Sequence, residues 1–187
     1  MIKLIATDID GTLVKDGTLI IDPEYMTVIS KLIDKGIIFT VCSGRQFSSE
    51  QKLFAPIKDK LMYITDGGTV VRTPDRILKT YPMSNELWKD MCRMVRDELP
   101  ACDYFAASPD LCYAEDGASP IFHRLRDSYG FEMREIDDLT KLENDDIIKF
   151  TVYHPDSCEE LCSPHFIPAW KDKAHVTSAG KEWVDCN

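Results

Sequence analysis

The sequence lacks the features that mark membrane, secreted and repeat proteins. None of its 187 residues belong to an apolar run that approaches the length of a transmembrane helix, which is about 20 residues. The N-terminus has no charged region followed by an apolar stretch, so we expect no signal peptide. We find no internal repeat and no low-complexity segment. These absences favour an ordinary globular chain of one domain or two small ones.

Positive charge is also scarce. The chain has 22 Lys and Arg residues against 32 Asp and Glu residues, a net charge of −10 and a pI of about 4.8. A nucleic-acid-binding protein needs a basic patch, so this composition argues against a nucleic-acid partner. It does not argue against a phosphorylated substrate, because a metal ion and a few donors can set the local field.

Cysteine is present in an odd number with scattered spacing. The seven cysteines, without a secretion signal, predict reduced thiols and a cytoplasmic location. His154, Cys158 and Cys162 recur at helical spacing with His165 close behind, a set that suits Zn²⁺. The alternative, which we favour, is a short amphipathic helix whose cysteines pack as small apolar side chains.

The chain opens with a short apolar run that leads directly into two acidic residues. Residues 1–7 (MIKLIAT) include β-branched side chains and neither Gly nor Pro, so they predict a buried strand. Asp8 and Asp10 follow at its carboxyl end, and Gly11 then turns the chain. Ligands of open α/β sheets bind beyond the carboxyl ends of the strands, so this position favours a functional site.

Two carboxylates separated by one residue suit phosphoryl transfer. One carboxylate can attack phosphorus and carry the phosphoryl group as an aspartyl-phosphate. The other can protonate the leaving oxygen and then activate the water that hydrolyses the intermediate. This chemistry needs a hard cation such as Mg²⁺ between the anionic groups. The alternative is a solvated Asp-Gly turn, which is common.

A helix and a second strand follow. Asp22-Pro23 predicts the start of a helix, with Asp22 as N-cap, and Gly36 predicts its end. Residues 37–41 (IIFTV) predict a second buried strand. A strand, a helix and a strand form a βαβ unit with parallel strands, so both strands should end at the same edge of the sheet.

The second strand ends in groups that can hold a phosphate. The Ser43 hydroxyl and nearby backbone N–H groups can donate hydrogen bonds, Gly44 allows close approach, and Arg45 can bind bidentately. A Ser-Gly turn taken alone is more often structural. Its place one βαβ unit after the two acidic residues favours the functional interpretation.

At this point the chain resembles the haloacid dehalogenase-like (HAD) phosphohydrolases. Their first motif, Asp-x-Asp-Gly-Thr after the first strand, is present in full as Asp8, Asp10, Gly11 and Thr12. The resemblance implies that Asp8 is the nucleophile and Asp10 the general acid/base. It also implies that Asp8 and the Asp10 carbonyl bind Mg²⁺, and that Gly11 and Thr12 lie at the substrate.

Two further stretches match the subfamily IIB, Cof-like members. Their second motif is a Ser or Thr that binds the phosphoryl group, and the Ser43-Gly44-Arg45 form is typical of them. After the third core strand they usually carry Asn-Gly-Ala, where this chain has Asp66-Gly67-Gly68. The resemblance implies a substrate contact by Asp66, and a plain hairpin turn is at least as good an interpretation.

The fold implied by this resemblance is α/β. We predict the N-terminal part of a Rossmann-like parallel-sheet HAD core over residues 1–82, with an α/β cap over 83–180 that covers the site and selects the substrate. The alternation of helices and strands after residue 83 independently predicts a second α/β unit. Residues 181–187 are predicted to begin the return to the core.

Two later motifs of the family are not found in the 187 residues. These are a Lys that steadies the nucleophile and an acidic motif that completes the Mg²⁺ site. We expect that the chain is a truncated form, a proteolysed form, or part of an assembly whose other chain covers the sheet edge. An open core edge would also favour self-association.

The leading hypothesis is a Mg²⁺-dependent phosphohydrolase that acts on a small phosphomonoester, either a sugar phosphate or a phosphorylated cofactor. A second hypothesis is a truncated or non-catalytic HAD-fold protein that binds a phosphorylated ligand or another protein. A response-regulator receiver fits less well, because receivers carry the phosphorylated Asp on a later strand and have no cap. We expect neither nucleic acid nor membrane as a partner.

Overall fold

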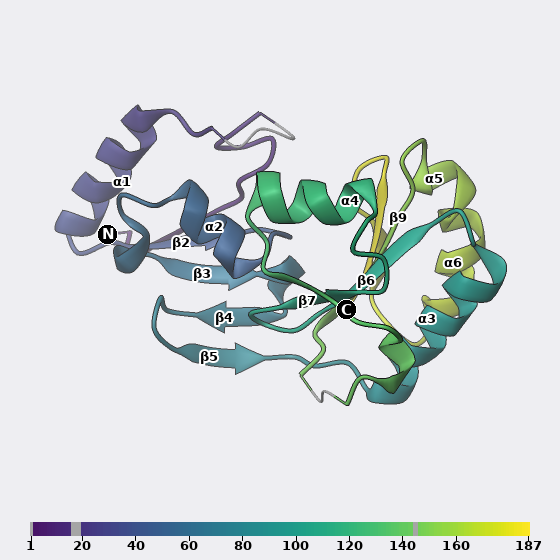
Figure 1. The fold of residues 1–187 in the computed structure, drawn as a ribbon. Coiled ribbons are helices and arrows are strands. Elements are labelled where there is room, and N and C mark those ends of the chain that lie inside the picture. Colours follow the sequence, from purple (N-terminus) through teal and green to yellow (C-terminus); the bar gives the residue numbers. More distant parts are fainter. Residues whose placement is uncertain (1, 16–19, 144–145) are drawn as a thin grey trace. The chain divides into compact units, whose positions relative to one another are not determined.

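The computed structural model describes residues 2–15, 20–143 and 146–187, which form two compact units (Figure 1). The first unit contains residues 1–80 together with 127–131, and the second contains 81–126 and 132–187. No helix in the described residues is long and apolar enough to cross a membrane.

The first unit is built on a sheet with the strand order β1-β2-β3-β4-β5 (Figure 1). Strands β1, β2 and β3 are parallel, with Leu4 opposite Ile38 and Thr40 opposite Met62, whereas β4 and β5 are antiparallel additions. The elements are β1 (Leu4–Thr7), α1 (Pro23–Asp34), β2 (Ile38–Cys42), α2 (Phe47–Leu53), η1 (Lys58–Lys60), β3 (Met62–Thr65), η2 (Asp66–Gly68), β4 (Val70–Arg72) and β5 (Ile77–Thr80). The predicted parallel α/β core is therefore present.

Local signals set the bounds of α1. The Asp22 carboxylate accepts a hydrogen bond from the Glu24 N–H at 2.9 Å, and Pro23 occupies the first turn. Gly36, with φ of +78°, follows the helix in the left-handed conformation that glycine adopts without strain. Ile29 is buried in the core of the first unit, where side chains from the helices meet those of the strands.

Strand β1 lies at one edge of this sheet. Among the described residues it pairs only with β2, and the side chains of Leu4 and Ile38 are 53% and 51% exposed. An unpaired strand edge with apolar side chains is a surface on which another strand can add. The predicted self-association through this edge remains a prediction.

The second unit has a sheet with the order β10-β11-β9-β6-β7-β8, and its core joins one face of that sheet to α3, α5 and α6. Trp88, Met91 and Val95 from α3 are fully buried there, as are Phe150 and Phe166. The elements are α3 (Asn85–Glu98), β6 (Asp103–Ala107), β7 (Cys112–Ala114), α4 (Pro120–His123), the π-helical turn η3 (Arg124–Tyr129), β8 (Met133–Glu135), η4 (Leu139–Lys141), β9 (Lys149–Tyr153), α5 (Cys158–Leu161), α6 (Ser163–Trp170), β10 (Val176–Ser178) and β11 (Trp183–Cys186). The part of η3 from Asp127 onward belongs to the first unit.

The end of the chain differs from the sequence-based division. Residues 181–187 were predicted to begin a return to the core, but β11 pairs with β9 and β10 in the sheet of the second unit. Val184 and Cys186 are fully buried in that unit's core cluster. The alternation of apolar residues reveals a strand, but it does not say which sheet the strand joins.

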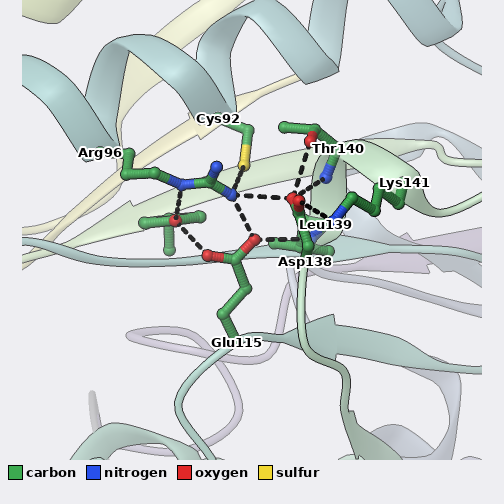
Figure 2. Close-up of polar contacts among 8 residues, drawn as sticks. Cys92, Arg96, Glu115, Asp138, Leu139, Thr140 and Lys141 are labelled. Carbon is green, nitrogen blue, oxygen red and sulfur yellow. Dashed lines mark hydrogen bonds and ion pairs between the residues drawn. The ribbon is translucent and has the colours of Figure 1, made fainter.

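Arg96 on α3 connects three segments of the second unit through hydrogen bonds and ion pairs (Figure 2). Its guanidinium Nη2 donates to Glu115 Oε1 at 2.6 Å and to Asp138 Oδ1 at 3.0 Å. Glu115 Oε2 accepts from the Tyr104 hydroxyl at 2.6 Å, and Asp138 caps η4 by accepting from Thr140 N–H. Arg96 thus links α3 to the residue after β7 and to the start of η4.

We predict that Arg96→Met lowers the free energy of unfolding of the second unit by about 1 kcal/mol, because two half-buried carboxylates lose their shared cation. Urea unfolding followed by circular dichroism measures the change. Arg93→Met is the matched control, since among the described residues Arg93 pairs only with Asp90, on the exposed side of the same helix. Equal losses in both variants would contradict a special role for Arg96.

Candidate active site

The two acidic residues of the first motif lie just beyond the carboxyl end of β1. Ile9 between them is fully buried, so Asp8 and Asp10 point away from the core: Asp8 is exposed and the Asp10 side chain is 31% exposed. The Ile9 carbonyl accepts the N–H groups of Leu13 and Val14 at 2.9 and 3.0 Å, which closes the turn. Gly11 supplies the φ of +76° that this turn requires.

The loop after β2 meets this turn. Arg45 is 5% exposed, and its Nε and Nη2 donate to the two carboxylate oxygens of Asp10 at 2.9 and 2.6 Å. Ser43 Oγ accepts a hydrogen bond from the Arg45 backbone N–H at 3.2 Å, and this bond stabilises the conformation of the loop. The structure therefore brings Asp10, Ser43 and Arg45 together, as expected for the ends of adjacent parallel strands.

Backbone hydrogen bonds from the turn η2 hold the loop after β2 in place. The Asp66 N–H donates to the Arg45 carbonyl at 3.0 Å, and the Gly67 N–H donates to the Ser43 carbonyl at 3.1 Å. Asp66 has a φ of +53°, which is uncommon for a residue with a side chain. Its carboxylate is fully buried and accepts from the Thr65 hydroxyl at 2.7 Å. Asp66 therefore holds the loop, and its contact with a substrate remains a prediction.

Three small or polar residues of the two turns are exposed to solvent: Gly11, Thr12 and Gly44. A Cβ atom added at Gly11 or Gly44 would meet no atom of the described residues within 4 Å. The backbone at these two positions is therefore open to close approach from that side. Binding by Gly11, Thr12 and Gly44 remains a prediction.

Sequence reasoning missed one acidic residue beside the site. Glu50 on α2 is fully buried, and neither carboxylate oxygen has a hydrogen-bond partner among the described residues. Burial raises the pKa of Glu50 well above its ordinary value, and the negative charge of Asp66 raises it further, while Arg45 lowers it. The signal was its spacing: Glu50 is three residues from both Phe47 and Leu53 and so shares their buried face.

The comparisons with known proteins fit this geometry. The family profile of the haloacid dehalogenase-like hydrolases matches residues 5–187, which is nearly all of the chain. The chain belongs to this family. The family and the α/β fold class predicted from the sequence are thereby confirmed.

This HAD-family chain has relatives of known structure or name. A crystal structure of a protein from Eubacterium rectale is 81% identical, with a TM-score of 0.85 over 100% of this chain and 70% of that one. The phosphatase YbjI of Escherichia coli (strain K12), named for 5-amino-6-(5-phospho-D-ribitylamino)uracil, is 26% identical over 147 residues. The subclass IIB sugar phosphatase BT4131 has a TM-score of 0.76 over 99% of this chain and 69% of that one, and its 17% identity shows the fold alone.

These matches do not span the whole of each relative. The aligned part is 76% of this chain but 52% of YbjI, so the chain spans about half the length of that curated relative.

The HAD-family site has donors of the kind that Mg²⁺ prefers. The Asp8 carboxylate is exposed and makes no hydrogen bond or ion pair within the part of the chain that the structure describes. Mg²⁺ is commonly held by one or two carboxylates, with waters and substrate phosphate completing the shell. No group of three or more His, Cys, Asp or Glu side chains converges on a metal position in residues 2–15, 20–143 and 146–187. The residues present therefore fit a Mg²⁺ ion that keeps most of its water.

Proposed function

We propose that this chain carries the nucleophile, the acid/base and the phosphate loop of a phosphatase that hydrolyses small phosphomonoesters with Mg²⁺. One observation supports this most strongly. The exposed Asp8 carboxylate makes no hydrogen bond or ion pair with the described residues, whereas the carboxylate of Asp10 is held by Arg45 beside the Ser43-Gly44 loop. One acid is thus open for attack, and the other is held in place for proton transfer.

In the proposed first step, Asp8 Oδ forms a bond to phosphorus as the ester oxygen leaves. Asp10 enters this step protonated and gives its proton to that oxygen, so the products are an alcohol and an aspartyl-phosphate on Asp8. Asp10 then takes a proton from a water that attacks phosphorus, which releases inorganic phosphate and restores the Asp8 carboxylate. The Ser43 hydroxyl and Arg45 bind the phosphoryl oxygens. When bound at Asp8 and the Asp10 carbonyl, Mg²⁺ supplies the positive charge that offsets carboxylate and phosphate.

The substrate class that we propose is a sugar phosphate or a phosphorylated cofactor. The name of YbjI, a phosphoribityl-pyrimidine phosphatase, supports a phosphate on a polyhydroxylated carbon chain. We assign the choice among such substrates to the second unit, as the cap of the enzyme. We expect no nucleic-acid or membrane partner, and we propose a cytoplasmic location, as the seven cysteines suggest.

The test is Mg²⁺-dependent hydrolysis of p-nitrophenyl phosphate by purified protein whose intact mass is measured on the same sample. We expect turnover that is lost with EDTA and restored by Mg²⁺. The same assay on a longer protein, if the source gene encodes one, separates the need for a further segment from a wrong assignment. Phosphate binding without turnover in both samples would overturn the proposal in favour of a non-catalytic phospho-ligand-binding protein.

A further inference from the structure

Two cysteines of the second unit lie in direct contact although they are far apart in the sequence. Cys102 Sγ and Cys162 Sγ are 2.6 Å apart, and both are thiols in this structure. A disulfide bond is about 2.05 Å long, so the two sulfur atoms need to approach by only about 0.5 Å. The spacing of these two cysteines in the sequence does not predict that they pair.

The fold itself brings the two residues together. Cys102 lies in the turn between α3 and β6, where its N–H donates to the Leu99 carbonyl at 2.9 Å. Cys162 joins the end of α5 to the start of α6, and its carbonyl accepts the Phe166 N–H at 2.8 Å. Backbone hydrogen bonds thus fix both positions, so the contact between the two sulfur atoms does not depend on a mobile loop.

The neighbouring groups argue against a zinc site at this place. Cys158 is buried one turn before Cys162, and its Sγ donates to the Val152 carbonyl at 3.6 Å. His165 is exposed and pairs with Glu98, while the His154 ring nitrogen Nδ1 accepts the Asp156 N–H at 3.2 Å. Cys158 and Cys162 are buried in the core of the second unit and Cys102 packs against it, and no three His, Cys, Asp or Glu side chains of the described residues are placed to hold a metal ion.

We propose that Cys102 and Cys162 form a site of reversible oxidation, at which a peroxide converts the two thiols to a disulfide. Cys102 is half-buried and Cys162 fully buried, so the peroxide meets Cys102 first. Hydrogen peroxide transfers one oxygen to Cys102, giving a sulfenic acid and one water. The Cys162 sulfur then attacks that sulfur, forms the S–S bond and releases a second water.

The reaction should be slow at neutral pH. Burial raises the pKa of the Cys102 thiol, and the contact with Cys162 raises it further. Since the thiolate is the reactive form, few molecules react at any moment. The oxidation is therefore followed over hours, with the disulfide trapped by alkylation of the remaining thiols.

The experiment counts thiols and maps the new bond. The natural protein is treated with hydrogen peroxide, alkylated in denaturant so that the buried thiols also react, and digested. We expect a peptide pair that joins Cys102 to Cys162 and separates on addition of dithiothreitol. The number of alkylated cysteines should fall by two from the seven in the sequence. Neither readout uses enzymatic activity, so the result is independent of the proposed function.

Three variants make the assignment specific. Cys102→Ser should abolish the new bond, whereas Cys158→Ser and the matched control Cys92→Ser should keep it, because Cys92 is buried in α3. Near-UV circular dichroism of each reduced variant confirms that it is folded before oxidation. Seven alkylated cysteines after treatment, a bond between Cys158 and Cys162, or a bond between two chains would each overturn the proposal.

Discussion

Replacing Asp8 with Asn is expected to lower the rate of phosphomonoester hydrolysis by about 10⁴-fold or more, since the amide cannot form the aspartyl-phosphate. The fold should be unaffected, because Asp8 is exposed and its side chain makes no hydrogen bond or ion pair with the described residues. Initial rates with p-nitrophenyl phosphate at saturating Mg²⁺ measure the loss. Acid quenching of the natural enzyme should trap labelled phosphate on Asp8, and the variant should trap none.

Asp22→Asn is the matched control for that experiment. Asp22 is also exposed in the first unit, but it caps α1, and Asn caps helices as well as Asp does. The same chemical change there should leave both the rate and the circular dichroism spectrum unaltered. Undiminished hydrolysis by the Asp8→Asn variant would show that another group is the nucleophile.

Replacing Glu50 with Gln is expected to raise the free energy of unfolding by about 2 kcal/mol at neutral pH. Glu50 is fully buried, lacks a hydrogen-bond partner for either carboxylate oxygen within the described residues, and lies near the charges of Asp66 and Asp10. Gln has the same shape and never carries the charge. Denaturant titrations of both proteins, monitored by tyrosine and tryptophan fluorescence and by circular dichroism, give the difference.

The ionisation of the buried Glu50 should also make the stability of the natural protein depend on pH. The pKa of Glu50 is raised in the folded chain, so between its ordinary value of 4.5 and the raised value the folded state binds more protons than the unfolded state. The contribution of Glu50 to stability is thus full below pH 4.5 and is lost as pH rises through the folded pKa. Glu50→Gln should remove that decline.

A change of net charge alone is not expected to remove the decline in stability with rising pH. Asp59→Asn changes the charge of the same unit by the same amount at an exposed position, so it should leave the slope of stability against pH in place. A Glu50→Gln variant that follows the natural protein at every pH would mean that Glu50 ionises in the folded state as it does in water.

The parts of the fold that follow from local rules were accessible from the sequence. The apolar run before Asp8, the Asp22 cap and the strand before Ser43 predicted β1, α1 and β2 and therefore a parallel pair. That pairing brings the ends of both strands to one edge, which is why Asp10, Ser43 and Arg45 were predicted to belong to one site. The prediction that the first strand is buried was wrong, because β1 lies at the edge of the sheet and none of its residues is buried.

Other features depend on tertiary contacts that no local pattern encodes. Helix α6 was not predicted, because Pro164 and Pro168 are helix breakers in isolation, yet Pro164 occupies its first turn and Pro168 lies inside it. Glu50 was missed because an acidic residue on a helix usually faces solvent. The inward direction of its side chain depends on the apolar residues around it, three positions away on either side.

The ion pair between Arg45 and Asp10 has a consequence for affinity. Two of the guanidinium nitrogens are already satisfied by a carboxylate, so an anion that takes the same pair must compete with a residue of the protein itself. The apparent dissociation constant for any such anion equals the intrinsic dissociation constant divided by the fraction of molecules in which Arg45 does not hold the Asp10 carboxylate. Asp10 thus acts as a tethered competitor for the Arg45 guanidinium, held beside it by the pairing of β1 with β2.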